Sequence, residues 1–219
     1  MNLLIGGQKI EKVSCCKYLG LFMDERLLFD EHINYVYKKL AKFSSIFYKV
    51  RYLLPYACLK KLYFAFVYPH ILFEIEIYAN TSKSRLDKLA KLNNKIIRIL
   101  LNKKVNTPVI MLFKIINVLP INELYAMQLL MFVHKCIYHK ELIPEVFHNY
   151  YISMQSVHCY SNRRNTDLYM MRVKSSLGQR CSVFKGSKLW NLLPADLKTY
   201  SSVFVFKKNL KNHLLNVTN

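Results

Sequence analysis

The stretch SRLDKLAKLNNKIIRIL, from Ser84 to Leu100, predicts an amphipathic helix and decides the fold class of this chain. Its apolar stripe has the spacing of one helical face and consists of Leu86, Leu89, Ile96, Ile97 and Leu100. Ser84 and Asp87 have the spacing of a capping box, in which side-chain oxygens satisfy free backbone N–H groups of the first turn. We therefore expect a helix capped by Ser84, with one face buried in a core.

The opposite face of this helix is basic. Its cations follow one another at spacings of three, four and three residues: Lys88, Lys91, Lys95 and Arg98. Exposed helix faces usually mix both signs, because unlike charges four residues apart support the helix, and only Asp87 lies nearby here. We expect this face to contact phosphate groups, with Lys103 and Lys104 extending it. The alternative is an ordinary solvated face.

Helical periodicity also predicts the segments before this helix. Residues 33–50 predict one long helix, with lysines between its apolar positions. A second helix begins near Pro55 and continues to about residue 67. Pro69 should end or kink it, and residues 71–78 continue as a further helix or as an irregular piece.

Four more segments follow the central helix. Thr107 as N-cap and Pro108 as first helical residue predict a helix to about residue 117. Residues 124–138 predict a strongly apolar helix that is buried on most sides. Residues 150–181 are polar, basic and without periodicity, which indicates a long loop or irregular lobe. The last two helices are expected at residues 182–193 and 202–215, and we expect Trp190, the only tryptophan, to be buried there.

The N-terminal residues favour β structure. Residues 3–5 and 9–13 flank Gly6–Gly7, a dipeptide suited to the positive φ values of a tight hairpin turn. A third strand is expected at residues 17–23, with Gly20 in its middle, where a close neighbour can require glycine. The expected fold is mainly α, a helical bundle with a small N-terminal antiparallel β hairpin or sheet and an irregular basic segment before the C-terminal helices.

Charge points to a polyanionic partner. Among 219 residues, 33 Lys and Arg oppose 13 Asp and Glu, a formal net charge of +20, while 53% of residues are hydrophobic. The chain is thus a foldable basic protein rather than a disordered tail, and nucleic acid is the commonest partner of such proteins. The longest apolar run, residues 62–73, is too short for a transmembrane span, which needs about 20 residues. With no secretory signal at its start, the chain is expected inside the cell, in the nucleus or cytoplasm.

Neither metal binding nor catalysis is favoured by the residue pattern. A zinc site could be assembled from His134, Cys136 and His139 with His148 or His158, but i and i+2 positions lie on different faces of a helix. The chain has no Gly-rich phosphate loop and no nucleophile elbow. Its closest carboxylate pairs suit turns, caps or solvated faces: Asp24/Glu25, Asp30/Glu31 and Glu74/Glu76. We assign no catalytic residue and no metal ligand.

A second basic zone lies in residues 160–180. Its cations, interleaved with Tyr160 and Tyr169, are Arg163, Arg164, Arg172, Lys174 and Arg180. Such a mixture is typical of surfaces that neutralise phosphates and stack bases, and it is equally typical of a basic loop folded over a core. Both interpretations stay open.

Several motifs in order resemble one protein family. The stretch KYLGLFMD at residues 17–24, followed by Leu28-Phe29 and His32-Ile33, resembles the strand after the polymerase palm in reverse transcriptases of non-LTR retrotransposons, particularly jockey-like elements. Further matching motifs are Leu62-Tyr63, Tyr68-Pro69, Ile96-Ile97-Arg98, Arg164-Asn165-Thr166, Gly178-Gln179-Arg180, Lys185-Gly186, the hexapeptide LWNLLP at 189–194, and Phe206-Lys207. The resemblance spans about residues 8–215. Two departures are Tyr78, where the family usually has Trp, and Asp167, where a basic residue often follows Asn-Thr.

The resemblance implies a reverse transcriptase fragment without its palm. It implies the end of the palm at residues 1–30, a helical thumb at 31–149 and a basic C-terminal segment at 150–219. Tyr18, Leu19 and Gly20 match the position that supports the primer terminus in the family. The metal-binding aspartates lie upstream of that strand, so Mg²⁺ is expected only with the palm, and RNA and DNA are the expected partners.

Two other classes of function stay open. One is a non-enzymatic nucleic-acid-binding or interaction module derived from a retroelement. The other is a protein that binds anionic membranes through basic amphipathic helices.

Overall fold

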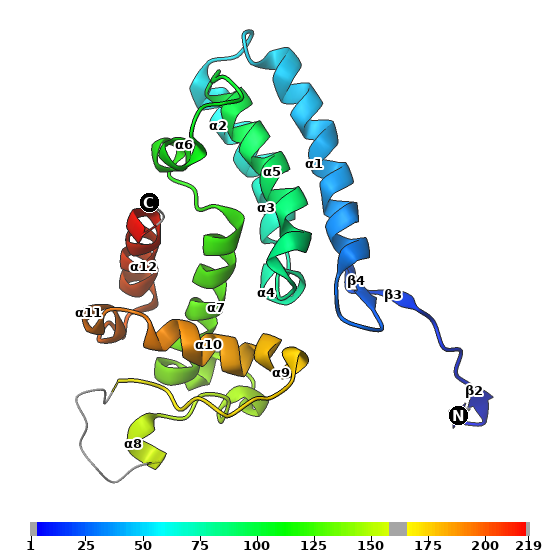
Figure 1. The fold of residues 1–219 in the computed structure, drawn as a ribbon, viewed down its shortest axis with the longest axis vertical. Coiled ribbons are helices and arrows are strands. Elements are labelled where there is room, and N and C mark those ends of the chain that lie inside the picture. Colours follow the sequence, from blue (N-terminus) through cyan, green and yellow to red (C-terminus); the bar gives the residue numbers. More distant parts are fainter. Residues whose placement is uncertain (1–3, 158–165, 218–219) are drawn as a thin grey trace.

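The computed structural model describes residues 4–157 and 166–217 and confirms a mainly helical protein with a small N-terminal β structure (Figure 1). The strands are β1 (Leu4–Ile5), β2 (Gln8–Lys9), β3 (Cys15–Tyr18) and β4 (Leu21–Asp24). The helices are α1 (Asp30–Val50), α2 (Tyr56–Phe66), α3 (Tyr68–Leu72), α4 (Ile75–Tyr78), α5 (Lys83–Leu100), α6 (Val109–Ile116), α7 (Ile121–Tyr138), α8 (Met154–Val157), α9 (Ser176–Arg180), α10 (Ser182–Asn191), α11 (Ala195–Lys198) and α12 (Val203–Val217). Short 3-10 turns follow α7 at Lys140–Leu142 and Glu145–Phe147.

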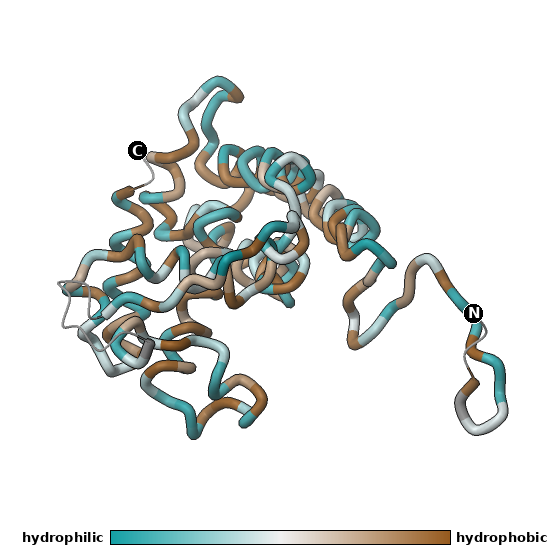
Figure 2. Tube along the Cα trace, turned by 60° about the horizontal axis from the view of Figure 1, so that its bottom comes forward, coloured by the Kyte–Doolittle hydropathy of each residue, from teal (hydrophilic) through white to brown (hydrophobic). Residues whose placement is uncertain are grey.

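The first hairpin has the turn that its glycines predict. β1 and β2 pair antiparallel, and Gly6 and Gly7 take φ values of 55° and 80°. The strands are shorter than expected, since residues 10–13 continue without pairing. This hairpin projects away from the helical body (Figure 2).

The prediction of one strand through Gly20 is wrong. Residues 15–24 form a second antiparallel hairpin, β3–β4, in which Tyr18 pairs with Leu21. Leu19 and Gly20 form its turn with φ values of 46° and 92°, and two successive positive φ values reverse the chain between two strands. A leucine at the first turn position, where Asn or Gly is usual, concealed the turn among alternating apolar residues.

Three predicted helix starts were also wrong by one to three residues. α5 begins at Lys83 with Ser82 as its N-cap, so the capping box at Ser84 does not form. α6 has Pro108 as its N-cap rather than as its first residue, because Pro108 is extended, with a ψ of 130°. α7 begins directly after Pro120 and therefore includes residues 121–123.

Pro69 interrupts the helix as expected, yet the chain stays helical afterwards. Val67, at the break, has a φ of −106°, and Pro69 lies in the first turn of α3, where its missing N–H is tolerated. Leu72 ends α3, Phe73 and Glu74 form a turn in which Glu74 has a φ of 54°, and residues 75–78 form α4, so residues 71–78 combine short helices with an irregular turn.

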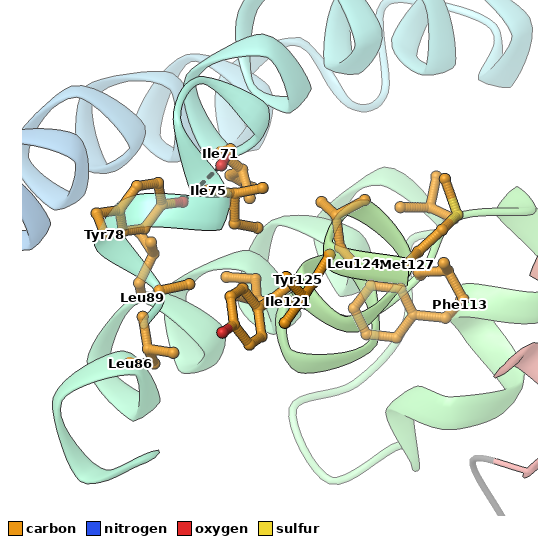
Figure 3. Close-up of a cluster of buried hydrophobic side chains, with 14 of the residues drawn as sticks. Ile71, Ile75, Tyr78, Leu86, Leu89, Phe113, Ile121, Leu124, Tyr125 and Met127 are labelled. Atoms are coloured by element: carbon orange, nitrogen blue, oxygen red, sulfur yellow. Dashed lines mark hydrogen bonds between the residues drawn. The ribbon is translucent and has the colours of Figure 1, made fainter. Parts of the chain in front are cut away.

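One apolar core joins the central helices (Figure 3). In Figure 3, Ile71 and Tyr78 from α3 and α4 face Leu89 of α5, and Leu124 of α7 lies beyond them. The buried hydroxyl of Tyr78 donates a hydrogen bond to the carbonyl of Ile71, which satisfies a polar group inside this core. The shared core fixes α5 against the helices that precede and follow it.

The C-terminal helices pack on α7, whose burial on most sides is confirmed. Trp190 of α10 is buried as predicted, at 1% exposure, and its indole N–H donates to the carbonyl oxygen of Thr166 at 3.0 Å. Within the described part of residues 150–181, α8 and α9 are the only α-helices, and an isolated bridge joins Ser153 to Leu168. The boundaries proposed at residues 30 and 149 stay predictions.

Candidate nucleic-acid interface

α1 and α5 lie side by side and run in the same direction (Figure 1). At their N-terminal ends, Nη1 of Arg85 and Oδ2 of Asp30 form an ion pair of 2.8 Å. One turn farther along both helices, Nζ of Lys88 donates to Oδ1 of Asn34 at 3.0 Å. These two contacts fix the register in which side chains of the two helices lie next to one another.

The basic face predicted on the central helix is the outer face of α5, and we call it the α5 stripe: Lys88, Lys91, Lys95 and Arg98. Lys91 and Lys95 are exposed. Lys88 also lies over the ring of Tyr37, 4.5 Å from its centroid, and Arg98 is half-buried and donates from Nε to the carbonyl oxygen of Thr107 at 3.1 Å. Two of the four cations thus already have partners in the chain, and Lys91 and Lys95 are the ones with free charges.

A second line of lysines lies beside the first. The α1 stripe consists of Lys38, Lys42 and Lys49, which are exposed, and their spacings of four and seven keep them within about 40° of one line on the helix. The lysines between the apolar positions of this helix are evident in the sequence, but their alignment as a stripe was not predicted. The pattern was present in the sequence; its position beside the α5 stripe depends on how the helices pack.

Aromatic and small side chains separate the two stripes. Tyr37 lies under Lys88 at the edge of α1 that faces α5. Ala41, Ser45 and Tyr48 follow Tyr37 at spacings of four, four and three, so the same edge of the helix continues through them. The outer surface of the pair therefore has cations along both sides and flat or small groups between them.

Negative charge is nearly missing from this surface. The sequence contains no Asp or Glu between Glu31 and Glu74, a range that covers most of α1 and all of α2. On α5 the one carboxylate is Asp87, one helical turn before Lys91, and both side chains line a cleft next to α6 and the start of α7 that also contains Glu123. A surface with cations and so few carboxylates has a positive potential, which attracts polyanions.

The Tyr18-Leu19-Gly20 motif lies at the tip of the β3–β4 hairpin. The side chains of Tyr18 and Leu19 are largely exposed, at 61% and 77%. Gly20 faces the ring of Phe73, and a Cβ at Gly20 would lie 3.3 Å from that ring. The hairpin adjoins the first turns of α1, where the rings of Phe22 and Tyr35 are 5.2 Å apart. Support of a primer terminus by this motif stays a prediction.

Asp24 organises the loop between this hairpin and α1. Its carboxylate accepts hydrogen bonds from the backbone N–H groups of Arg26, Leu28 and Phe29, the last at 2.6 Å. Partial burial alone would raise the pKa of Asp24, but these donors stabilise the charged form and hold its pKa below the ordinary value. Of the turn, cap and solvated-face roles that the sequence left open for the carboxylate pairs, Asp24 has that of a turn residue.

The second basic zone is only partly described. Tyr160, Arg163 and Arg164 lie outside the described residues. Arg172 is exposed in the segment before α9. Arg180 is half-buried and donates from Nη1 to the carbonyl oxygen of Leu27 at 3.2 Å, so it stabilises the loop before α1. Contact of these arginines with nucleic acid stays a prediction.

Arg180 also lines a groove of about 1000 Å³ between α3–α4, α7 and α9–α10. This groove is mainly apolar and contains Glu74 and Glu76. Burial, reinforced by the neighbouring Glu74, raises the pKa of Glu76. Two carboxylates make this groove a poor site for a polyanion, in contrast to the α1 and α5 stripes.

Residues considered for zinc have other partners. Nε2 of His134 pairs with the carbonyl oxygen of Tyr200 at 2.7 Å, and Nε2 of His139 pairs with that of Ser201 at 2.7 Å. In the described segments, no group of three His, Cys, Asp or Glu side chains is placed to hold a metal ion.

Within residues 4–157 and 166–217, no single helix is both long enough and apolar enough to cross a membrane. Only α6 and α7 taken together meet these two criteria, and they bend by 49° at the break between them.

Comparison of the chain with protein-family models, with curated proteins and with solved structures found no significant match. The resemblance to jockey-like reverse transcriptases rests on the ordered motifs of this sequence, and the case for nucleic-acid binding rests on the surface of α1 and α5.

Proposed function

We propose that this chain binds the backbone of double-stranded nucleic acid through the outer surface of α1 and α5. The observation that carries this proposal is the presence of two lysine stripes on neighbouring parallel helices. Their free cations are Lys38, Lys42, Lys49, Lys91 and Lys95. A single stripe is common on solvated helices, whereas two adjacent stripes of one sign repel each other unless an anion lies between them.

The dimensions of this surface fit a nucleic-acid backbone. Packed helix axes are about 8–10 Å apart, and eleven residues of helix extend for roughly 16 Å. Each strand of a duplex carries one phosphate per 3.4 Å of its axis, so several phosphates lie within reach of the lysines. Lysine acts as a mobile point charge, and reading of base sequence usually needs planar groups such as guanidinium. The expected binding therefore does not depend on sequence.

We propose further that the chain is the thumb and C-terminal part of a retrotransposon reverse transcriptase. The ordered motifs support this assignment, and a thumb has to hold primer–template by its backbone. All 13 carboxylates belong to the described residues, and no group of three or more His, Cys, Asp or Glu side chains among these residues is placed to hold a metal ion. In the family that these motifs resemble, nucleotide transfer belongs to the palm upstream of the Tyr-Leu-Gly strand, and we propose that this chain contributes the grip on the duplex.

A salt titration with a membrane competitor tests the proposal. Fluorescence anisotropy of a labelled RNA–DNA hybrid duplex measures the dissociation constant as the salt concentration rises. Five free cations predict a log–log slope of magnitude roughly 4 or more, with similar affinity for unrelated sequences. Vesicles rich in anionic lipid should not displace the duplex. A slope near zero, or a protein that binds such vesicles and ignores the duplex, contradicts the proposal.

A further inference from the structure

The junction of α1 and α2 lies at one end of the molecule (Figure 1). Aromatic side chains at this junction are exposed to solvent. We call this surface the aromatic tip, and its residues are Tyr48, Arg51, Tyr52, Leu53 and Tyr56. Three of these side chains are more than half exposed: 56% for Tyr48, 69% for Tyr52 and 79% for Leu53. Single exposed side chains of this kind are common, whereas their grouping at one tip is typical of a contact surface.

The guanidinium group of Arg51 contacts the rings of both Tyr48 and Tyr52. Arg51 lies over both of them, with its Cζ 4.1 Å from the ring centroid of Tyr48 and 4.6 Å from that of Tyr52. Its Nε is buried without a hydrogen-bond partner, and among the described residues Arg51 forms no ion pair with a carboxylate. The cation therefore holds the rings by cation–π contact, and its charge stays available to an anion.

The backbone that links α1 to α2 forms a hydrogen-bonded turn. The N–H groups of Leu53 and Leu54 both donate to the carbonyl oxygen of Val50, at 3.0 and 3.1 Å. Pro55 then fixes the entry into α2 with a φ of −65°. Because the turn is ordered before any ligand arrives, little conformational entropy is lost when the rings meet a partner.

Cations and aromatic rings also alternate along the exposed side of α2. Tyr56, Lys60, Lys61 and Phe64 line a shallow groove of about 630 Å³ that adjoins the tip. Neither this groove nor the tip contains a carboxylate, since the sequence has none between residues 31 and 74. Proteins that hold single-stranded nucleic acid combine these two elements, cations for the backbone and rings on which bases stack.

We propose that the aromatic tip binds unpaired bases of a single strand that continues from the duplex held on α1 and α5. This inference rests on the proposed function, because the α1 stripe ends at Lys49, next to the first ring of the tip. Charge favours nucleic acid over a second copy of this chain, since two copies would bring Arg51 and the lysines of α2 against their equivalents.

The test compares oligonucleotides with and without bases. The probes are a labelled single strand of about ten nucleotides and an abasic strand of the same length, which keeps the phosphates and removes every stacking partner. The double variant Tyr48→Ala/Tyr52→Ala should bind the base-containing strand roughly 25-fold or more weakly, since each lost ring–base stack is worth about fivefold or more. Its affinity for the abasic strand should not change, and the single variant Tyr52→Ala, whose ring lies beyond the end of α1, should leave the affinity for blunt duplex unchanged.

Two further variants make the result specific. Phe204→Ala removes a 76%-exposed aromatic ring from α12 and should leave all affinities unchanged. Tyr48→Phe/Tyr52→Phe keeps both rings and should retain wild-type affinity, which separates stacking from any effect of the tyrosine hydroxyls. Because Tyr48 and Tyr52 are exposed, the alanine variant should keep the wild-type circular dichroism spectrum.

Each contrary result has its own meaning. Equal binding of abasic and base-containing strands by the wild type overturns the role of the tip and leaves duplex binding by α1 and α5 intact. Failure to bind any duplex overturns the proposed function as well. If the alanine variant changes only self-association, the tip is a contact between copies of the chain. If the variant changes only vesicle binding, the tip is a membrane contact. Either result overturns the inference.

Discussion

Removal of the Trp190 side chain should be among the most damaging single changes in this protein. The ring is 1% exposed and lies 5.8 Å from the ring of Phe206, centroid to centroid, so it joins α10 to α12. Burial of about 200 Å² of aromatic surface at about 25 cal/mol per Å² is worth roughly 5 kcal/mol. Core truncations of large aromatic residues cost about 3–5 kcal/mol. Trp190→Ala also leaves the carbonyl oxygen of Thr166 without its donor, which adds about 1 kcal/mol.

We therefore expect Trp190→Ala to lower the free energy of unfolding by about 4 kcal/mol, with a fall in Tm of roughly 8–16 °C. Urea unfolding followed by far-UV circular dichroism is the suitable measurement, because the variant lacks the only tryptophan and has no indole fluorescence. Trp190→Phe keeps a ring against Phe206 and loses the hydrogen bond, so it should cost about 1–2 kcal/mol.

The neighbouring Leu192 provides a matched control. It is 73% exposed, and Leu192→Ala should change the free energy of unfolding by less than about 0.5 kcal/mol. A loss below about 1 kcal/mol for Trp190→Ala, or equal losses for Trp190→Ala and Leu192→Ala, would refute the idea that this indole anchors the C-terminal helices.

Three further predictions concern chemistry, pH and backbone strain. The purified chain should incorporate no nucleotide on a primed RNA template with Mg²⁺ or Mn²⁺, and incorporation that changes when carboxylates of this chain are replaced would contradict this. Burial lowers the pKa of His32 from 6.5 to about 4, so between these values the unfolded chain takes up a proton that the folded chain excludes. The free energy of unfolding should therefore be highest above pH 6.5 and fall by about 3 kcal/mol towards pH 4. Urea titrations of His32→Leu should show a smaller fall over the same pH range. Gly20→Ala should lower the free energy of unfolding by about 1–2 kcal/mol. The loss should exceed that of Gly7→Ala, because a Cβ at Gly7 would meet nothing within 4 Å. Equal losses for the two variants would show that the contact with Phe73 is unimportant.

Much of the helical fold could be predicted from the sequence because apolar periodicity reports directly on burial. The 3.6-residue pattern located α1, α5 and α7 to within a few residues, and Trp190 was correctly placed in the core. Helix starts were less predictable, since several polar residues near a helix end can serve as its cap. The β3–β4 turn was missed because Leu19 takes a positive φ that leucine rarely adopts, and the sequence alone does not reveal it.

In the candidate site, too, features of a single helix could be predicted from the sequence, whereas features that depend on helix packing could not. The α5 stripe follows from spacing on one helix and was predictable. The α1 stripe has equally regular spacing, but its importance comes from the parallel packing of α1 on α5, which is a tertiary feature fixed by contacts such as Lys88 to Asn34. The internal contacts of Lys88 and Arg98 were likewise beyond the reach of the sequence, because they depend on side chains and carbonyl groups from other segments.

The salt dependence of duplex binding in two charge-matched variants tests the central claim most directly. One variant replaces free lysines of both stripes by glutamine: Lys38, Lys42, Lys91 and Lys95. The other makes the same change at exposed lysines elsewhere: Lys140, Lys188, Lys207 and Lys208. Both variants lose four charges, so general attraction to a polyanion falls equally, whereas only the first loses phosphate contacts.

We expect the log–log slope against salt to become shallower by roughly 3–4 in the stripe variant, since each lost phosphate contact on DNA contributes about 0.9. The slope of the second variant should change by less than about 1, and both should unfold at wild-type urea concentrations. A stripe variant with an unchanged slope, or with the same change as the second variant, would contradict the claim that α1 and α5 form the nucleic-acid interface.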